Sequence, residues 1–115
     1  MTWYYAHSML IYNTQRERDE YERLKMLVRD VINPNTDIER TTDMSVYNDA
    51  VRKSYGVICS EIEGHIGKGV FTEITTAFSE NKKVYVLRKN TLIPVKGVVI
   101  TNDKDWKLSY GKVIT

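Results

Sequence analysis

The chain has 115 residues, 42% of them apolar, which is enough for one hydrophobic core and a single domain over residues 1–115. The formal net charge is +2 at pH 7 and no long run of Lys and Arg occurs, so the composition disfavours nucleic acid and an anionic membrane surface as partners. The apolar runs are too short to cross a bilayer and the N-terminus lacks the pattern of a secretory signal, so we expect a cytoplasmic protein.

The first predicted element is a strand at the N-terminus. Thr2 to Ala6 (TWYYA) is rich in residues that favour strands, and the run stops at the polar pair His7 and Ser8. A loop follows, and its Tyr12 is a candidate ligand contact. The alternative for Tyr12, as for the other tyrosines, is a packing residue with a hydrogen-bonded tip.

The second predicted element is a helix from about Gln15 to Arg29. Thr14 and Glu17 have the spacing of a capping box, and apolar residues then recur on one helical face. These residues are Tyr21, Leu24, Leu27, Val28, Val31 and Ile32. We expect the charged run RERDEYERLK on this helix to be a solvated face.

The middle of the chain predicts a brief strand, an irregular stretch, a short helix and a third strand. Asp30 to Asn35 (DVINPN) is a short apolar run that ends at a proline. Asn35 to Met44 has no clear period, whereas Ser45 to Ser54 begins with a good cap and is typical of a short helix. The strand GVICSEI follows and contains Cys59, the only cysteine, which we expect to be buried and unreactive.

The last third predicts a helix from about Val70 to Glu80 and a buried strand from Lys83 to Arg88. Leu92 to Asn102 adds one or two short extended pieces, and the pattern of Asp103 to Thr115 is ambiguous. Alternating strands and helices predict an α/β fold. We expect a three-layer, Rossmann-like (flavodoxin-like) parallel sheet of about five strands with helices on both faces.

In a parallel sheet of this kind, ligands bind at the carboxyl ends of the strands. This rule selects three groups of residues before any family is considered: His7 and Ser8, Asn33 and Asn35, and the segment Glu61–Glu73. We expect these groups to converge on one cleft.

The stretch GHIGKGVFTEITTAF, from Gly64 to Phe78, leads from a loop into the third predicted helix. Gly67 and Gly69 would let the backbone approach a ligand closely, and the helix start and Lys68 favour an anion such as a phosphate. The spacing is that of neither a Walker A loop nor a dinucleotide fingerprint. The alternative is an ordinary flexible turn before a helix.

Glu73 is the candidate catalytic residue. A carboxylate in the first turn of a helix is kept ionised by the helix dipole and can attack or stabilise an electron-poor carbon. The alternative is an acid that only complements the dipole.

The residues GVFTEITTAFSENKKVYVLR resemble a region of nucleoside 2-deoxyribosyltransferases and the related deoxynucleoside monophosphate N-glycosidases. In that region a glycine-containing loop precedes a helix with the catalytic glutamate, and Glu73 falls on it. The segments YYAHS, VINPN and GVICSEI are similar to the first three strands of this superfamily, in the same order. The resemblance implies a nucleoside deoxyribosyltransferase-like domain that acts on a nucleoside or nucleotide, and a homodimer whose chains complete each other's sites.

The sequence also departs from that pattern. Gly67 stands where the transferases have an aspartate, Val70 where they have a threonine, and Gly56 where an aspartate often opens the third strand. The loop GKGV, which would place Val70 against the ligand, is nearer to the glycosidase branch. His7 replaces a usual glycine. The short chain is similar to small members from archaea and their viruses, for which the location would be the host cytoplasm.

His7 and His65 are the only histidines, and neither has a second ligand at a metal-binding spacing, so we expect no metal and no cofactor. His65 is a candidate ligand or acid/base contact, and His7 could donate to a ribose or phosphate. Three hypotheses remain open. The chain is an N-glycosidase that uses Glu73, a nucleotide-binding module without turnover, or a structural or interaction protein in which Glu73 only supports its helix.

Overall fold

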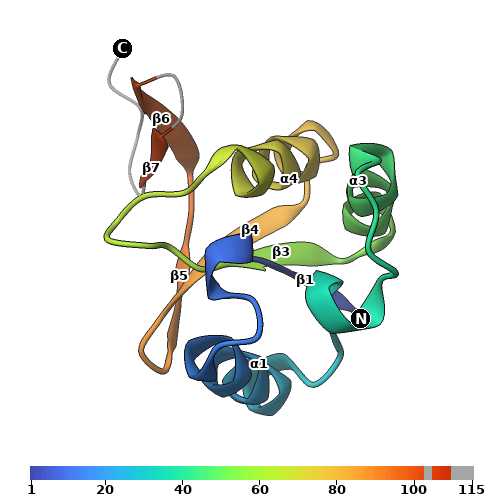
Figure 1. Cartoon of the computed structure of the whole chain (residues 1–115). Helices are drawn as coiled ribbons and strands as arrows, with labels where there is room; N and C mark the ends of the chain where they lie inside the picture. The colour runs from blue at the N-terminus through green and yellow to red at the C-terminus, as the bar shows by residue number, and fades with distance from the viewer. Residues whose placement is uncertain (103–104, 110–115) are drawn as a thin grey trace.

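A five-stranded sheet organises the chain in the computed structural model, which describes residues 1–102 and 105–109 (Figure 1). The strand order is β2-β1-β3-β4-β5. The strands are β1 (Trp3–Ala6), β2 (Val31–Ile32), β3 (Gly56–Cys59), β4 (Lys83–Arg88) and β5 (Thr91–Pro94). The pairs β1·β2, β1·β3 and β3·β4 are parallel, whereas β5 runs antiparallel to β4. The chain is therefore a mixed α/β fold with a mostly parallel sheet.

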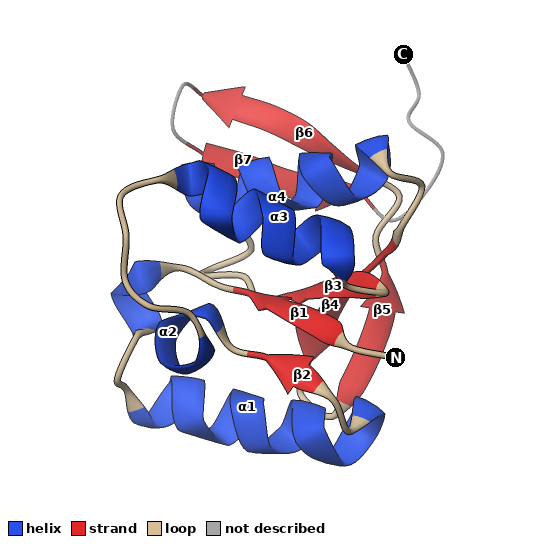
Figure 2. Ribbon diagram, turned by 90° about the vertical axis from the view of Figure 1, so that its right-hand side faces the viewer, coloured by secondary structure: helices blue, strands red, loops and turns tan. Residues whose placement is uncertain are grey.

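The helices lie on both sides of this sheet. Helix α1 (Gln15–Val28) covers one side, and helices α3 (Met44–Lys53) and α4 (Lys68–Ser79) cover the other (Figure 2). The short helix η1 (Met9–Ile11) follows β1, and α2 (Pro34–Asp37) follows β2. No helix in the described ranges is long and apolar enough to cross a membrane.

Alternating residues of β1 enter two different apolar clusters. Tyr4 and Ala6 pack with residues of α3 and α4, such as Val51 and Ile74. Trp3 and Tyr5 pack on the α1 side, with Leu24 at the centre. Because side chains of a strand point alternately to opposite faces, this four-residue strand serves both layers of helix.

The register of the parallel strands aligns their carboxyl ends. Ala6 of β1 lies opposite Cys59 of β3, and the N–H of Ser60 donates to the carbonyl of Ala6 over 3.0 Å. The residues that follow these strands, His7 and Ser60, therefore lie at the same edge of the sheet. This arrangement brings the first loop and the glycine-containing loop together.

The expectation of an all-parallel sheet is wrong at one edge. Only Lys89 and Asn90 separate β4 from β5, and two residues can form a hairpin but not the crossover that a parallel pair needs. The predicted extended segment Leu92–Asn102 divides into β5 and β6 (Gly97–Asn102). The tail left ambiguous contains β7 (Asp105–Ser109), which pairs with β6 in a separate two-stranded sheet, while 103–104 and 110–115 lie outside the described residues.

Helix α1 begins as predicted, because the side chain of Thr14 accepts from the N–H of Glu17. Its charged run is not a wholly solvated face, since Glu17 and Glu20 are buried. Glu20 accepts hydrogen bonds from the Tyr5 hydroxyl over 2.5 Å and from the Ser60 hydroxyl over 2.9 Å. These donors replace water around the carboxylate, which is why two acids of this run can face the sheet.

Gly56 opens β3 at a crowded point. A Cβ atom there would lie 2.6 Å from the carbonyl oxygen of Lys83 and 2.6 Å from the ring of Trp3. Real Cβ contacts are longer, so the packing of Trp3 requires glycine at this position. The structure thus gives an intramolecular reason why no aspartate opens this strand.

Candidate functional site

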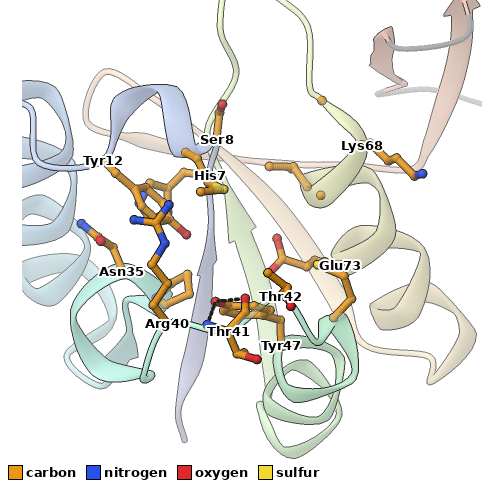
Figure 3. Close-up of a pocket in the computed structure, with 16 residues that line it drawn as sticks. His7, Ser8, Tyr12, Asn35, Arg40, Thr41, Thr42, Tyr47, Lys68 and Glu73 are labelled. Atoms are coloured by element: carbon orange, nitrogen blue, oxygen red, sulfur yellow. Dashed lines mark hydrogen bonds between the residues drawn. The ribbon is translucent and has the colours of Figure 1, made fainter.

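A cavity of about 730 Å³ lies at the carboxyl ends of β1 and β2, beside the start of α4 (Figure 3). A volume in this range suits a small organic ligand. The cavity is lined by His7, Ser8, Met9, Tyr12, Pro34, Asn35, Arg40, Thr41, Thr42, Met44, Tyr47, Gly67, Lys68, Gly69, Val70 and Glu73. The cleft predicted from the strand ends is thus present, but not all of the predicted residues line it. Asn33 is buried and caps α2, and residues 61–66, His65 among them, lie outside the lining.

Glu73 is buried in α4 and contributes the one carboxyl group among the described residues that line the cavity. The hydroxyl of Tyr4, from the middle of β1, donates a hydrogen bond to it. Burial raises the pKa of Glu73 to about 8, although the Tyr4 hydrogen bond acts in the opposite direction. At neutral pH the carboxyl group of the free protein is therefore mostly protonated.

Two expectations about Glu73 are wrong. Helix α4 begins at Lys68, two residues earlier than predicted, so Glu73 lies in the second turn and not the first. The effect of a helix dipole is concentrated in the first turn, and the desolvation of the buried carboxyl group outweighs it. Glu73 is thus neither a first-turn acid nor a group that the dipole keeps ionised.

Steric crowding does not require glycine at Gly67 or Gly69, at the start of α4. Gly67 is the N-cap, provides no side-chain cap and has an extended backbone with φ −89°. A Cβ atom at Gly67 or Gly69 would meet nothing within 4 Å. Among the glycines that the structure describes, Gly64, with φ +79°, is the one whose backbone conformation requires glycine. Gly67 and Gly69 both line the cavity.

Lys68 and Val70 have other positions than the sequence suggested. The amine of Lys68 points away from Glu73 and His7, so only other parts of the residue border the cavity (Figure 3). Val70 is buried and packs in the cluster that joins α4 to the sheet. Val70 therefore borders the cavity as part of the apolar core.

The stretch before α3, which showed no period, supplies the cationic side of the cavity. Arg40 extends toward Tyr12, across the cavity from Glu73 (Figure 3). Burial and the charge of Glu73 raise the pKa of Tyr12 to about 12, and Arg40 works against this rise. Thr41 is held in place by Tyr47, whose hydroxyl donates to its carbonyl over 3.3 Å and accepts from its N–H over 3.4 Å.

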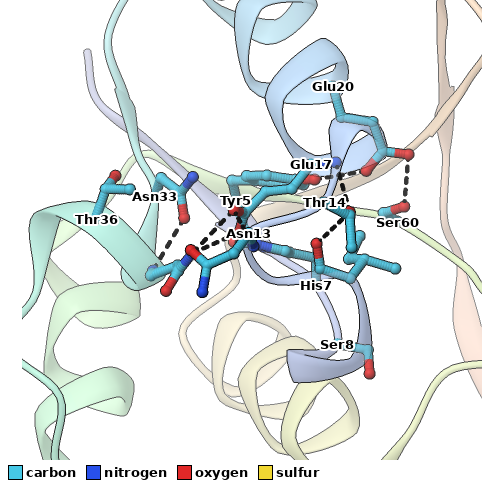
Figure 4. A network of polar contacts seen from close by, with 12 residues as sticks. Tyr5, His7, Ser8, Asn13, Thr14, Glu17, Glu20, Asn33, Thr36 and Ser60 are labelled. Carbon is cyan, nitrogen blue, oxygen red and sulfur yellow. Dashed lines mark hydrogen bonds and ion pairs between the residues drawn. The ribbon is translucent and has the colours of Figure 1, made fainter.

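His7 is not available to donate to a ligand, contrary to our expectation. Its imidazole is fully buried, with Nε2 placed 2.6 Å from a carboxylate oxygen of Glu17 and Nδ1 placed 3.0 Å from the carbonyl oxygen of Tyr5 (Figure 4). The ring of Tyr5 stacks on it at 3.7 Å. Only the remaining parts of His7 border the cavity.

Glu17 collects donors from several segments. The N–H of Asn13 donates to it over 2.9 Å, and the side-chain amide of Asn35 donates to its two oxygens over 2.8 and 3.1 Å. Burial would raise the pKa of Glu17, but the hydrogen bonds from His7, Asn13 and Asn35 outweigh it and lower the pKa.

Ser8 and Tyr12 both reach the cavity, and His65 does not. The hydroxyl of Ser8 caps η1 by accepting from the N–H of Leu10 over 3.1 Å. Nδ1 of His65 lies 3.1 Å from the carbonyl of Glu63, and its backbone bridges to Ile62 in the loop before α4.

No protein family model, curated protein or solved structure matches the chain significantly. The described residues contain no group of three or more His, Cys, Asp or Glu that could hold a metal ion. We therefore infer the chemistry of the cavity from the residues that line it. The described lining residues provide the carboxyl group of Glu73, the guanidinium of Arg40 and several hydroxyl groups. They also include the apolar side chains of Met9, Pro34 and Met44.

Proposed function

We propose that the cavity binds a nucleoside or nucleotide and that Glu73 acts on its N-glycosidic bond, in an N-glycosidase or (deoxy)ribosyltransferase-like reaction. The observation that carries this proposal is the position of Glu73, a buried carboxyl group at a ligand-sized cavity, with a pKa of about 8. A raised pKa is characteristic of carboxyl groups that exchange protons with substrates near neutral pH. The resemblance of the glycine-containing loop and α4 to the deoxynucleotide glycosidases supports the same reaction.

One carboxyl group can serve both halves of a hydrolysis. In its acid form Glu73 would give its proton to the departing base as the C1′–N bond breaks and the base keeps the bonding electrons. The carboxylate left behind would then stabilise the cationic C1′ of the sugar. Water would add to C1′ and return a proton to Glu73. This sequence needs no second acid, which agrees with Gly67 in place of an aspartate.

Arg40 would bind the anionic end of the ligand in this scheme. Its guanidinium extends into the cavity, and no described residue forms a hydrogen bond or ion pair with it. A guanidinium binds phosphate oxygens through paired hydrogen bonds. We therefore propose that nucleoside monophosphates bind better than nucleosides.

We also propose that the fold is a three-layer, Rossmann-like (flavodoxin-like) single domain. The strand order β2-β1-β3-β4-β5 and the placement of α1 opposite α3 and α4 support this assignment. The antiparallel β5 would then be an edge variation on the parallel pattern.

A homodimer is part of the proposal. Exposed apolar side chains occur around the cavity on η1 and α3. Met9 and Met44 line the cavity, Leu10 follows Met9, and Val46 lies two residues after Met44. A second copy that covers these side chains would also close the cavity. Light scattering that detects only monomer at high concentration would remove this part of the proposal.

The alternative is a nucleotide-binding module without turnover, which the single carboxyl group of the lining favours. The test is a screen of deoxynucleosides, deoxynucleoside monophosphates and NAD for binding and for release of free base. Glu73→Gln should release base at least about a hundredfold more slowly than wild type while it still binds. The matched control is Glu63→Gln, an exposed loop glutamate outside the cavity. If the wild-type protein binds a nucleotide without releasing free base, and Glu73→Gln binds it equally well, the enzyme proposal fails and the binding module is supported.

A further inference from the structure

The first turn after β1 is held by a buried pair between His7 and Glu17 (Figure 4). Both partners are inaccessible, with 0% and 5% of their side chains exposed. This pair takes no part in the proposed reaction, and neither of its side chains can reach the ligand directly.

The two nitrogens of His7 both face acceptors. A backbone carbonyl, such as that of Tyr5 opposite Nδ1, can only accept a hydrogen bond, so Nδ1 carries a hydrogen. Nε2 faces Glu17, whose carboxylate already receives donors from Asn13 and Asn35. An ionised Glu17 therefore requires a hydrogen on Nε2 as well. The geometry is that of an imidazolium paired with a carboxylate.

The pair is connected to the cavity through two lining residues. The ring of Tyr12 lies against the imidazole, with 4.9 Å between ring centroids. The amide of Asn35 donates to both oxygens of Glu17. Tyr12 and Asn35 are both part of the cavity wall. A change in the charge of the imidazole would therefore alter the contacts of two residues that face the ligand.

We propose that His7, protonated and paired with Glu17, is a positioning residue that holds Tyr12 and Asn35 in the wall, so that loss of its proton weakens ligand binding. A neutral imidazole has one N–H for two facing acceptors, so either the contact with Glu17 or the contact with the Tyr5 carbonyl would lose its hydrogen bond. The proposal rests on the cavity being the ligand site, but the state of His7 can be measured without any ligand.

The titratable groups that face the imidazole are Tyr5, Tyr12 and Glu17. Tyr5 and Tyr12 lie on its two faces, and burial raises the pKa of both phenols, that of Tyr12 to about 12. Hydrogen bonds lower the pKa of Glu17 despite its burial. Glu73 lines the same cavity and titrates near pH 8, so binding has to be compared in a Glu73→Gln background.

The first measurement is a nitrogen-15 NMR spectrum of the imidazole side chains in the whole protein. The chain has two histidines, so His65→Gln assigns the remaining signals to His7. We expect both nitrogens of His7 to carry hydrogen at pH 7, and Glu17→Gln to leave only Nδ1 protonated and to shift the Tyr12 ring signals. A neutral His7 in the wild-type protein would overturn the proposal, whether or not Glu17→Gln folds.

The second measurement is the binding of deoxyadenosine monophosphate to Glu73→Gln at several pH values. We expect its Kd to rise by about tenfold once His7 loses its proton, the effect of roughly one lost hydrogen bond. Adding His65→Gln should leave this rise unchanged. A Kd that stays constant while the NMR signals show His7 losing its proton would overturn the positioning role. If deoxyadenosine monophosphate does not bind at any pH, that result counts against the proposed function. The NMR spectrum then still tests whether both nitrogens of His7 carry hydrogen.

Discussion

Tyr4 of β1 donates its hydroxyl hydrogen to Glu73 of α4, across 69 residues of sequence. Both side chains are buried, and the phenol is the one hydrogen-bond partner of this carboxyl group among the described residues. Burial and the charge of Glu73 raise the pKa of Tyr4 well above its ordinary value, so the phenol remains a donor. The sheet thus fixes the orientation of the candidate catalytic group.

Replacing Tyr4 with Phe should remove this donor without removing the ring. We expect a loss of about 1–3 kcal/mol in the free energy of unfolding, measured with urea, because a buried acceptor is left without a partner. The pKa of Glu73 should rise further, since the Tyr4 hydrogen bond lowers it. Carboxyl carbon-13 NMR would detect that shift, and an unchanged or lower pKa would contradict the assigned direction.

The stability of the protein should fall as the pH rises from about 4.5 to 8. The pKa of Glu73 is about 8 in the folded chain against 4.5 ordinarily, so between these values the folded state binds the extra proton. The free energy of unfolding then decreases with pH, by an amount on the order of a few kcal/mol, and levels off above the folded pKa. Glu73→Gln should lose this dependence and be more stable than wild type at pH 9. Urea unfolding at pH 5, 7 and 9 checks both points, and parallel profiles for the two proteins would refute the prediction.

Replacing Arg40 with Gln should weaken the binding of a nucleoside monophosphate more than that of the nucleoside. A charge-assisted hydrogen bond to phosphate contributes about 1.5–3 kcal/mol, which corresponds to roughly 10- to 150-fold in Kd. Lys68→Gln is the matched control, because the amine of Lys68 points away from Glu73 and His7 (Figure 3). Calorimetry with both ligands measures the difference. Equal losses for the two ligands, or a larger effect at Lys68, would argue against a phosphate contact at Arg40.

Gly56→Ala should destabilise the fold, whereas Gly67→Ala should not. The new Cβ at Gly56 would meet the Lys83 carbonyl and the Trp3 ring, each at 2.6 Å, and overpacking of this kind costs about 1–3 kcal/mol. The same change at Gly67 meets open space. If Gly67 serves the ligand, its alanine variant should keep its stability in thermal unfolding and lose affinity. Similar melting temperatures for the two variants would refute the packing argument.

The sequence predicted most of the sheet and the place of the cavity because these depend on local patterns. Apolar strands such as VYVLR and the capped helix after Thr14 have strong periodic signals, and parallel strands bring their carboxyl ends together. Glu73 was identified because it follows a glycine-containing loop. The start of its helix was misplaced because Gly67 caps it without a side-chain signal.

Other features depend on contacts distant in sequence. Arg40 lies in a stretch without period, and no local pattern shows that it reaches a cavity formed by η1 and α4. The burial of Glu17 and Glu20 depends on donors from His7, Tyr5 and Ser60, which a helical charge pattern cannot indicate. The antiparallel β5 was predictable, since the two-residue connection after Arg88 excludes a crossover.

Both edges of the sheet resist the addition of a further strand. On one side β2 has only two residues, Val31 and Ile32, and on the other β5 ends at Pro94, which has no backbone N–H to offer. Short strands and proline at an edge are common protections against uncontrolled edge-to-edge aggregation. Self-association of this chain by strand addition to its main sheet is therefore disfavoured, and an ordered assembly should use side-chain surfaces instead.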